Sequence, residues 1–218
     1  GRIAADKAIR NNSEIAFFEV EDETQLLRNA KIVHDLSTAI ASPELKLFYQ
    51  PQIKLETGRV ERLEALVRWQ HPELGMIPPS EFIPLAEGTL LINPFTKWVL
   101  DQTLSQLASW REKGCDLCVS INFSMKNFYD STIFDLIHQS LQKYKIPAQK
   151  LEIEVTETAF AANLHQVADV LHTLREMGVR IAIDDFGTGQ SSLHYLLELP
   201  LDVVKIDQVF IRNMLENP

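Results

Sequence analysis

The sequence predicts an α/β fold built around a mostly parallel sheet, and two observations support this prediction. Apolar runs typical of strands alternate with amphipathic runs typical of helices from residue 45 onward, and in the second half of the chain the unit recurs about every 30 residues. Such alternation is typical of parallel sheets covered by helices, either closed barrels or open doubly wound sheets. The 218 residues are 45% hydrophobic and 23% charged, which suffices for a domain with a sizeable core.

The individual elements follow from the spacing of the apolar residues. A short strand is expected over residues 15–20, followed by an amphipathic helix over residues 21–42. The apolar stripe of this helix would consist of Leu26, Ala30, Val33 and either Leu36 or Ile40. Six further strands are expected at residues 45–51, 60–69, 117–123, 150–157, 179–185 and 201–207. Helices are expected between them at residues 80–87, 94–111, 130–144, 164–177 and 191–199.

Charged side chains end one face of several of these strands. Side chains alternate between the two faces of a strand, so Glu154 points away from Ile153 and Val155, and Asp184 points away from Ile183. A single charged strand end is most simply a solvated loop or an ion pair. In parallel α/β folds, however, the carboxyl ends of all strands open onto one mouth. The polar groups expected to converge there are Glu64, Asn122, Glu154, Asp184 and Asp185.

So many acidic groups cannot stay ionised together without cations. Oxygen ligands favour Mg²⁺ or Mn²⁺ over zinc, and two such ions about 3.5–4 Å apart are the usual device for attack on a phosphodiester. The adjacent Asp184 and Asp185 could face two cations, or one cation and one water. The net charge of −9 argues against nucleic-acid polymers or anionic membranes as partners of a broad basic face.

Cysteine content and hydropathy bear on zinc binding and on the compartment in which the protein works. Cys115 and Cys118 form a C-x-x-C pair, but zinc would need a second pair, so two reduced thiols are expected. No apolar run reaches the roughly 18 residues of a membrane span, and no signal-peptide pattern opens the chain. We therefore expect a cytoplasmic chain, or the cytoplasmic part of a larger protein.

Six segments, in their order along the chain, resemble the EAL family of cyclic di-GMP phosphodiesterases. They are FYQPQI (48–53), EALVRWQHPELGMIPPSEFIPLAE (64–87), SINFS (120–124), EIEVTE (152–157), IDDFGTGQSSL (183–193) and VKIDQVFI (204–211). The resemblance covers roughly residues 43–218. It implies a modified TIM-like (β/α)₈ barrel with an antiparallel first strand, which hydrolyses cyclic di-GMP to linear pGpG with two Mg²⁺ or Mn²⁺ ions.

The resemblance also implies metal and catalytic roles. Lys205 would orient the attacking water and balance charge on the phosphorane. Asp185 would help to hold the second ion or that water. Glu157 would anchor the 185–189 loop, in which Gly187 and Gly189 suit positive φ angles. Metal ligation is implied for Glu64, Asn122, Glu154, Asp184 and Asp185.

Further positions are implied on the substrate side. Arg68 would grip a phosphate, with Gln50, Leu66 and Asp207 also contacting the substrate. Gln190 stands where the family commonly has a tyrosine, and we expect little effect from this difference. His71 is expected to structure a loop, and Trp98 and Trp110 are expected in the core. For Phe82 and residues 84–87 two interpretations stay open, a guanine pocket or packing alone.

Other functional classes fit less well. The D-F-G at residues 185–187 also occurs in protein kinases, but the chain lacks their H-R-D loop and glycine-rich fingerprint. A non-catalytic cyclic di-GMP receptor is the main alternative. Receptors of this family typically lose E-A-L or the paired aspartates, and both are intact here.

The resemblance also predicts how the domain is bounded. Residues 1–23 are expected to be a linker or the remnant of a preceding GGDEF domain, and residues 24–218 an EAL domain that is incomplete at its C-terminus. A complete family domain has two further strand–helix units, which carry a glutamate base and a glutamine near the substrate. We therefore expect an unclosed barrel, truncated after the sixth strand, with little or no hydrolytic activity on its own. A homodimer formed through residues 191–199 and a GGDEF or sensory domain are the expected protein partners.

Overall fold

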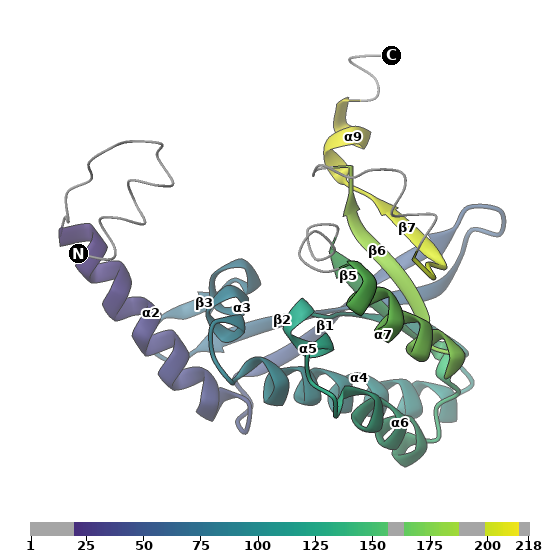
Figure 1. Cartoon of the computed structure of the whole chain (residues 1–218), viewed down its shortest axis with the longest axis horizontal. Helices are drawn as coiled ribbons and strands as arrows, with labels where there is room; N and C mark the ends of the chain where they lie inside the picture. The colour runs from purple at the N-terminus through teal and green to yellow at the C-terminus, as the bar shows by residue number, and fades with distance from the viewer. Residues whose placement is uncertain (1–19, 157–163, 188–198, 214–218) are drawn as a thin grey trace.

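The computed structural model describes residues 20–156, 164–187 and 199–213, and these form an α/β fold (Figure 1). The sheet has seven strands, which are β1 (Leu45–Lys54), β2 (Arg59–His71), β3 (Gly75–Ile77), β4 (Cys118–Asn122), β5 (Leu151–Thr156), β6 (Arg180–Phe186) and β7 (Val203–Ile206). Its order is β1-β2-β4-β5-β6-β7, with β3 paired only to β2. β1 is antiparallel to β2, whereas each later pair along this order is parallel. The predicted α/β class and antiparallel first strand are confirmed.

Described helices lie between β2 and β4, between β4 and β5 and between β5 and β6, and α4, α6 and α7 line one side of the sheet (Figure 1). The described helices are α2 (Val20–Ala39), α3 (Pro79–Glu87), α4 (Ile92–Glu112), α5 (Met125–Phe128), α6 (Ile133–Tyr144), α7 (Leu164–Glu176) and α9 (Gln208–Asn213), with a short 3₁₀ helix, η1 (Ala148–Lys150). The predicted helices agree with these within a few residues. The helix predicted at 191–199 and most of the strand predicted at 15–20 lie outside the described residues. In the described part of the sheet β1 and β7 are end strands, so the barrel is open, as expected.

The buried face of α2 agrees with the predicted stripe at Leu36, which is fully buried, but not at Leu26 and Ala30. Ile32, Leu36 and Ala39 are fully buried, whereas Leu26 is 42% exposed and Ala30 is also exposed. The fully buried residues of α2 lie in its second half, whereas its first half contacts α3 through the ion pair of Arg28 with Glu81. The regular spacing that begins at Leu26 therefore does not describe a buried face. Val20, predicted to end a strand, is the first residue of α2.

An aromatic chain links the sheet to α3 and α4. The rings of Trp69 and Phe82 meet edge to face with centroids 5.4 Å apart, and those of Phe82 and Phe95 with centroids 5.7 Å apart. Phe82 is fully buried, so it packs in the core rather than facing a ligand. Trp98 stacks on Phe95, and Trp110 meets Tyr49 edge to face, in agreement with their predicted core positions.

His71 orders the turn between β2 and β3. Its Nδ1 accepts hydrogen bonds from the backbone N–H groups of Glu73 and Leu74, at 3.1 and 3.0 Å. The proton therefore lies on Nε2, which donates to Asp35 Oδ2 of α2 at 2.9 Å. This confirms the predicted loop-structuring role and ties α2 to the sheet.

Two smaller predictions concern the cysteines and the membrane. Cys115 and Cys118 are both free thiols, as predicted. Within the described parts of the chain, no helix combines the length and the apolar character needed to cross a bilayer.

The aromatic chain generates a stability prediction. Phe82→Ala should lower the free energy of unfolding by about 3–5 kcal/mol, because it leaves a cavity between Trp69 and Phe95. Urea unfolding followed by circular dichroism measures the change. Leu90→Ala is the matched control, since Leu90 is 92% exposed and should shift stability by no more than about 0.5 kcal/mol. Equal effects of the two substitutions would contradict the packing role of Phe82.

Candidate metal centre and adjoining pocket

The carboxylates of Glu64, Glu154 and Asp184 meet although they come from three different strands: Glu64 from the middle of β2, and Glu154 and Asp184 from the second halves of β5 and β6. One oxygen from each lies within 4.8 Å of the others. The register explains this convergence, because Asn122 of β4 is aligned with Glu154, and Thr156 of β5 is aligned with Asp184. Parallel pairing thus holds the polar ends of neighbouring strands at nearly the same height. We call Glu64, Glu154 and Asp184 the acid cluster.

Lys205 of β7 reaches into the acid cluster with its ammonium group. Its Nζ lies 3.0 Å from Glu64 Oε2, 2.6 Å from Glu154 Oε2 and 3.0 Å from Asp184 Oδ2. An ammonium group has three donors, and here each has a carboxylate acceptor. Burial lowers the pKa of Lys205, but the contacts with Glu154 and Glu64 outweigh it and raise the pKa well above its usual value. Lys205 is therefore charged and offsets part of the repulsion among the acids.

Glu154 is the most buried member of the acid cluster, with no exposed surface. Burial raises its pKa to about 7; the Lys205 ammonium opposes this shift, and the neighbouring charge of Glu64 adds to it. Its Oε1 has no hydrogen-bond partner among the described residues. A buried carboxylate oxygen without a partner is costly, and a cation would satisfy it. The donor set therefore fits a hard divalent cation bound through oxygen.

Asn122 extends the acid cluster along the same edge of the sheet. Its Nδ2 donates to Glu64 Oε1 at 3.1 Å. The amide nitrogen is committed to this bond, so the amide oxygen is the atom that could ligate a metal. Of the five predicted metal ligands, the structure brings Glu64, Glu154 and Asp184 into one cluster, with Asn122 directly beside them.

A bulge in β6 gives Asp184 and Asp185 access to the same mouth. Ile183 pairs with Val204 and Phe186 with Ile206, so β6 uses one residue more than β7 over this interval. Asp185 has a φ of +54°, which is unfavourable for a residue other than glycine by about 1–3 kcal/mol. The Asp185 N–H donates to Asp184 Oδ1 at 3.0 Å, which supports this conformation. Consecutive strand residues normally face opposite sides, and the bulge removes that restriction.

Asp185 is not a member of the acid cluster, and its pKa is shifted by different neighbours. Burial raises the pKa of Asp185, and so do the nearby negative charges of Asp184 and Asp207. Asp207 caps α9, because its Oδ1 accepts a bond from the N–H of Val209 at 2.7 Å. The negative charges of Asp184 and Asp207 beside Asp185 make this a position where a cation would be favourable.

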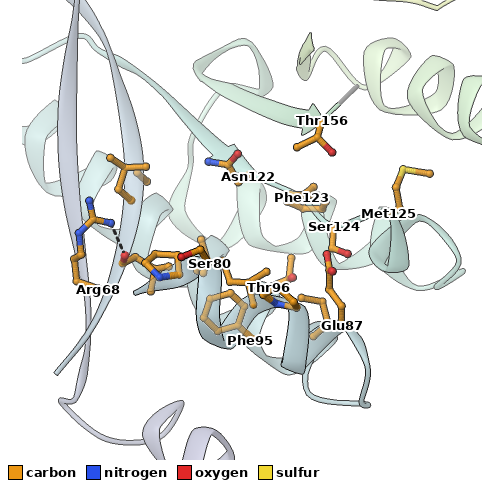
Figure 2. A pocket seen from close by; sticks show the side chains of 18 of the residues that line it. Arg68, Ser80, Glu87, Phe95, Thr96, Asn122, Phe123, Ser124, Met125 and Thr156 are labelled. Atoms are coloured by element: carbon orange, nitrogen blue, oxygen red, sulfur yellow. Dashed lines mark hydrogen bonds between the residues drawn. The ribbon is translucent and has the colours of Figure 1, made fainter. Parts of the chain in front are cut away.

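A pocket of about 660 Å³ adjoins the acid cluster and lies between β2, α3, α4 and the loop after β4 (Figure 2). Asn122 and Asp185 line it, which connects it to the acid cluster. Other polar groups in its wall are Arg68, Ser80, Glu87, Thr96, Ser124 and Thr156. Its apolar lining includes Leu66, Ile83, Pro84, Phe95 and Met125.

The predicted substrate residues divide between the pocket and its surroundings. Leu66 and Arg68 line the pocket, and Arg68 Nη1 donates to the carbonyl oxygen of Val67 at 2.7 Å. Gln50 is exposed on β1 and is paired with Glu64 of β2. Asp207 is close enough to Asp185 to raise the pKa of that carboxyl group. Neither Gln50 nor Asp207 lines the pocket. Glu157, Gly189 and Gln190 lie outside the described residues.

Sequence reasoning missed the network that holds the loop after β4. Asn127 Oδ1 accepts bonds from the Ser124 N–H at 2.9 Å and from Thr96 Oγ1 at 3.2 Å. Its Nδ2 donates to Asn93 Oδ1 at 3.0 Å, and Asn93 in turn donates to Asp130. This network positions Ser124 and Met125 in the pocket wall. The available signal was the S-x-x-N spacing of a capping box at residues 124–127.

Comparisons with known proteins agree with this geometry. A family model described as "EAL domain" matches residues 33–218. The chain is 42% identical over 188 residues to the cyclic di-GMP phosphodiesterase PA2567 of Pseudomonas aeruginosa, covering 86% of this chain and 32% of that protein. It is 40% identical over 184 residues to the cyclic di-GMP phosphodiesterase PdeR of Escherichia coli, covering 84% of this chain and 28% of that protein. The chain thus spans about a third or less of these relatives.

Solved structures give the same result. The structure described as "PaMucR Phosphodiesterase, c-di-GMP complex" matches with a TM-score of 0.80 and 38% sequence identity, over 86% of this chain and 76% of that one. The EAL enzyme Bd1971, in its form with cAMP and cyclic di-GMP bound, also matches with a TM-score of 0.80, at 30% identity over 88% of this chain and 54% of that one.

The central position of Lys205 generates a prediction about charge. Lys205→Met should destabilise the metal-free protein by about 3 kcal/mol at pH 8, because it leaves a buried group of carboxylates without a cation. The loss should shrink at pH 6, because the buried carboxyl group of Glu154, whose pKa is raised to about 7, can then take up a proton. Urea unfolding in the presence of a chelator measures both values.

Lys143→Met provides the control for this measurement. Lys143 forms an exposed ion pair with Asp101, so its substitution should change stability by about 1 kcal/mol or less at either pH. A Lys205→Met protein as stable as the Lys143→Met protein would show that Lys205 does not neutralise the acid cluster.

Proposed function

The chain belongs to the EAL domain family, and from this premise we propose that the protein hydrolyses cyclic di-GMP to linear pGpG with Mg²⁺ or Mn²⁺. The observation that carries the proposal is the acid cluster, which joins three strands and contains a buried oxygen with no partner among the described residues. It adjoins a pocket whose wall contains Arg68, a donor suited to phosphate.

In this proposal the acid cluster and Asn122 hold one divalent cation, and Asp185 contributes to a second. When bound, such cations lower the pKa of water and stabilise the charge that develops on the phosphate. Hydrolysis adds one water across a P–O3′ bond, which leaves a 5′-phosphate on one guanosine and a 3′-hydroxyl on the other. Lys205 keeps the excess negative charge of the carboxylates low enough for a phosphate to approach. It would orient the attacking water with an N–H that one of its three carboxylate partners releases when that partner ligates a cation.

The substrate lies in the pocket in this proposal. Its phosphate contacts Arg68, and its base lies along the apolar wall formed by Leu66, Ile83 and Pro84. Gln50 and Asp207, which do not line the pocket, are proposed to contact the part of the substrate that extends beyond it. Glu157 is proposed to anchor the loop that begins at Asp185, and two copies of the chain are proposed to form a homodimer. The division into a linker or GGDEF remnant (1–23) and an EAL domain (24–218) remains a proposal.

A non-catalytic receptor is the second candidate, because the pocket alone could bind cyclic di-GMP. The intact acid cluster favours the enzyme, since binding of a nucleotide does not require a buried group of carboxylates around a cation site. The two candidates therefore differ in what the loss of Glu64 should do.

Glu64→Ala separates catalysis from binding. In the intact protein with Mn²⁺, cyclic di-GMP should be converted to pGpG, and Glu64→Ala should abolish conversion while largely retaining binding of the dinucleotide. Chromatography of the products measures conversion, and calorimetry measures binding. The 218-residue chain is assayed with protein in excess over substrate, so that slow turnover is also detected. Binding by the intact protein without any product would favour the receptor.

Arg68→Ala tests the phosphate contact. The substitution should weaken cyclic di-GMP binding by about 10- to 100-fold, since it removes a charge-assisted hydrogen bond. Mn²⁺ binding should not change, because Arg68 has no contact with the acid cluster. Arg59→Ala is the matched control: Arg59 is an exposed residue of the same strand, and its loss should affect neither measurement. Unchanged dinucleotide binding by Arg68→Ala would place the substrate elsewhere.

A further inference from the structure

The backbone just after Asp185 is in close contact with α9. Gly187 has a φ of +99°, and a Cβ added there would lie 2.7 and 2.8 Å from two ring carbons of Phe210. The ring therefore occupies the space that any side chain at position 187 would need. Phe210 thus packs on the backbone of the segment that contains the strained Asp185.

Phe210 has little role in the general core. Its side chain is 48% exposed, and its neighbours Val209 and Ile211 are 52% and 55% exposed. A ring that is half in solvent contributes only part of its apolar area to stability. Its main described contact is local, and that contact lies two residues from Asp185.

The position of α9 is fixed at its beginning. Asp207 accepts a bond from the Val209 N–H at 2.7 Å, and the Asp207 carbonyl oxygen accepts from the Phe210 N–H at 3.2 Å. Two residues earlier, Lys205 is held by the acid cluster. The segment 205–210 therefore contacts the segment 184–187 at two points: Lys205 meets Asp184, and Phe210 meets Gly187.

We propose that Phe210 is a positioning residue that holds Asp185 in its left-handed conformation through the Gly187 backbone. The proposal rests on the proposed function, because it assigns Asp185 a purpose at the metal centre. A residue with a φ of +54° stays in that conformation only if its surroundings enforce it. Asp184 does so from the N-terminal side through the Asp185 N–H, and Phe210 does so from the C-terminal side. Loss of the ring removes the restraint on the C-terminal side and weakens the hold on the conformation of Asp185.

Metal binding tests this proposal without relying on turnover. Phe210→Ala in the full chain should weaken Mn²⁺ binding at the Asp185 position by about 10-fold or more, as the loss of a residue that orients a ligand typically does. Titration followed by electron paramagnetic resonance gives both affinity and stoichiometry. Phe210→Leu keeps apolar contact but lacks the ring, so an intermediate effect is expected. Ile211→Ala is the control, since it removes a similarly exposed apolar side chain from the same helix.

A double-mutant cycle decides whether Phe210 acts through Asp185. If it does, the losses from Phe210→Ala and Asp185→Asn should not add, and the double variant should bind Mn²⁺ no more weakly than Asp185→Asn alone. Additive losses, or Mn²⁺ affinities of Phe210→Ala and Phe210→Leu equal to that of the unsubstituted chain, would overturn the proposal. Thermal unfolding identifies a variant that fails to fold, in which case Phe210→Leu carries the test.

The positioning role of Phe210 and the proposed hydrolysis of cyclic di-GMP can fail independently of each other. Mn²⁺ binding that depends on Phe210 supports the positioning role even if cyclic di-GMP is not hydrolysed. Conversely, hydrolysis that stops in Glu64→Ala but proceeds unchanged in Phe210→Ala would keep the function and overturn the positioning role.

Discussion

The shared contact between one ammonium group and three carboxylates is the interaction on which the site depends. Lys205 lies 3.0, 2.6 and 3.0 Å from the carboxylates of Glu64, Glu154 and Asp184, which come from strands far apart in the sequence. Like charges at this spacing would otherwise repel one another or take up protons. Parallel strand pairing brings the three carboxylates together, and the positive charge of Lys205 reduces the repulsion between them. It leaves a net negative site that favours a divalent cation.

The bulge in β6 allows two consecutive residues to point toward the same site, which a regular strand does not allow. Asp184 bonds to Lys205, while its neighbour Asp185 lines the pocket, although consecutive strand residues should face opposite sides. One additional residue and one left-handed backbone conformation redirect the second carboxylate. The site thus uses local strain to place two acids where regular pleating would place one.

The sequence was sufficient to predict the strands and the convergence of their polar ends. Runs such as residues 151–155 and 180–184 have clear alternation, and parallel pairing makes their ends meet. The buried face of α2 was only partly predictable, because apolar residues of its first half such as Leu26 remain exposed, so their spacing does not report burial. β3 is too short to show a period, and α5 forms because of a cap at Ser124 rather than an apolar pattern. The contact of Phe210 with Gly187 depends on three-dimensional proximity that no local pattern encodes.

Helix α3 separates two environments. On one side Glu81 pairs with Arg28 of α2, and α2 is held further by the bond between Asp35 and His71. On the other side Ser80, Ile83, Pro84 and Glu87 form part of the pocket wall. Helix α3 therefore contacts α2 on one side and lines the pocket on the other. If an occupant of the pocket changes how strongly a partner binds to α2, thermodynamic reciprocity requires that this partner change the affinity for the occupant by the same factor.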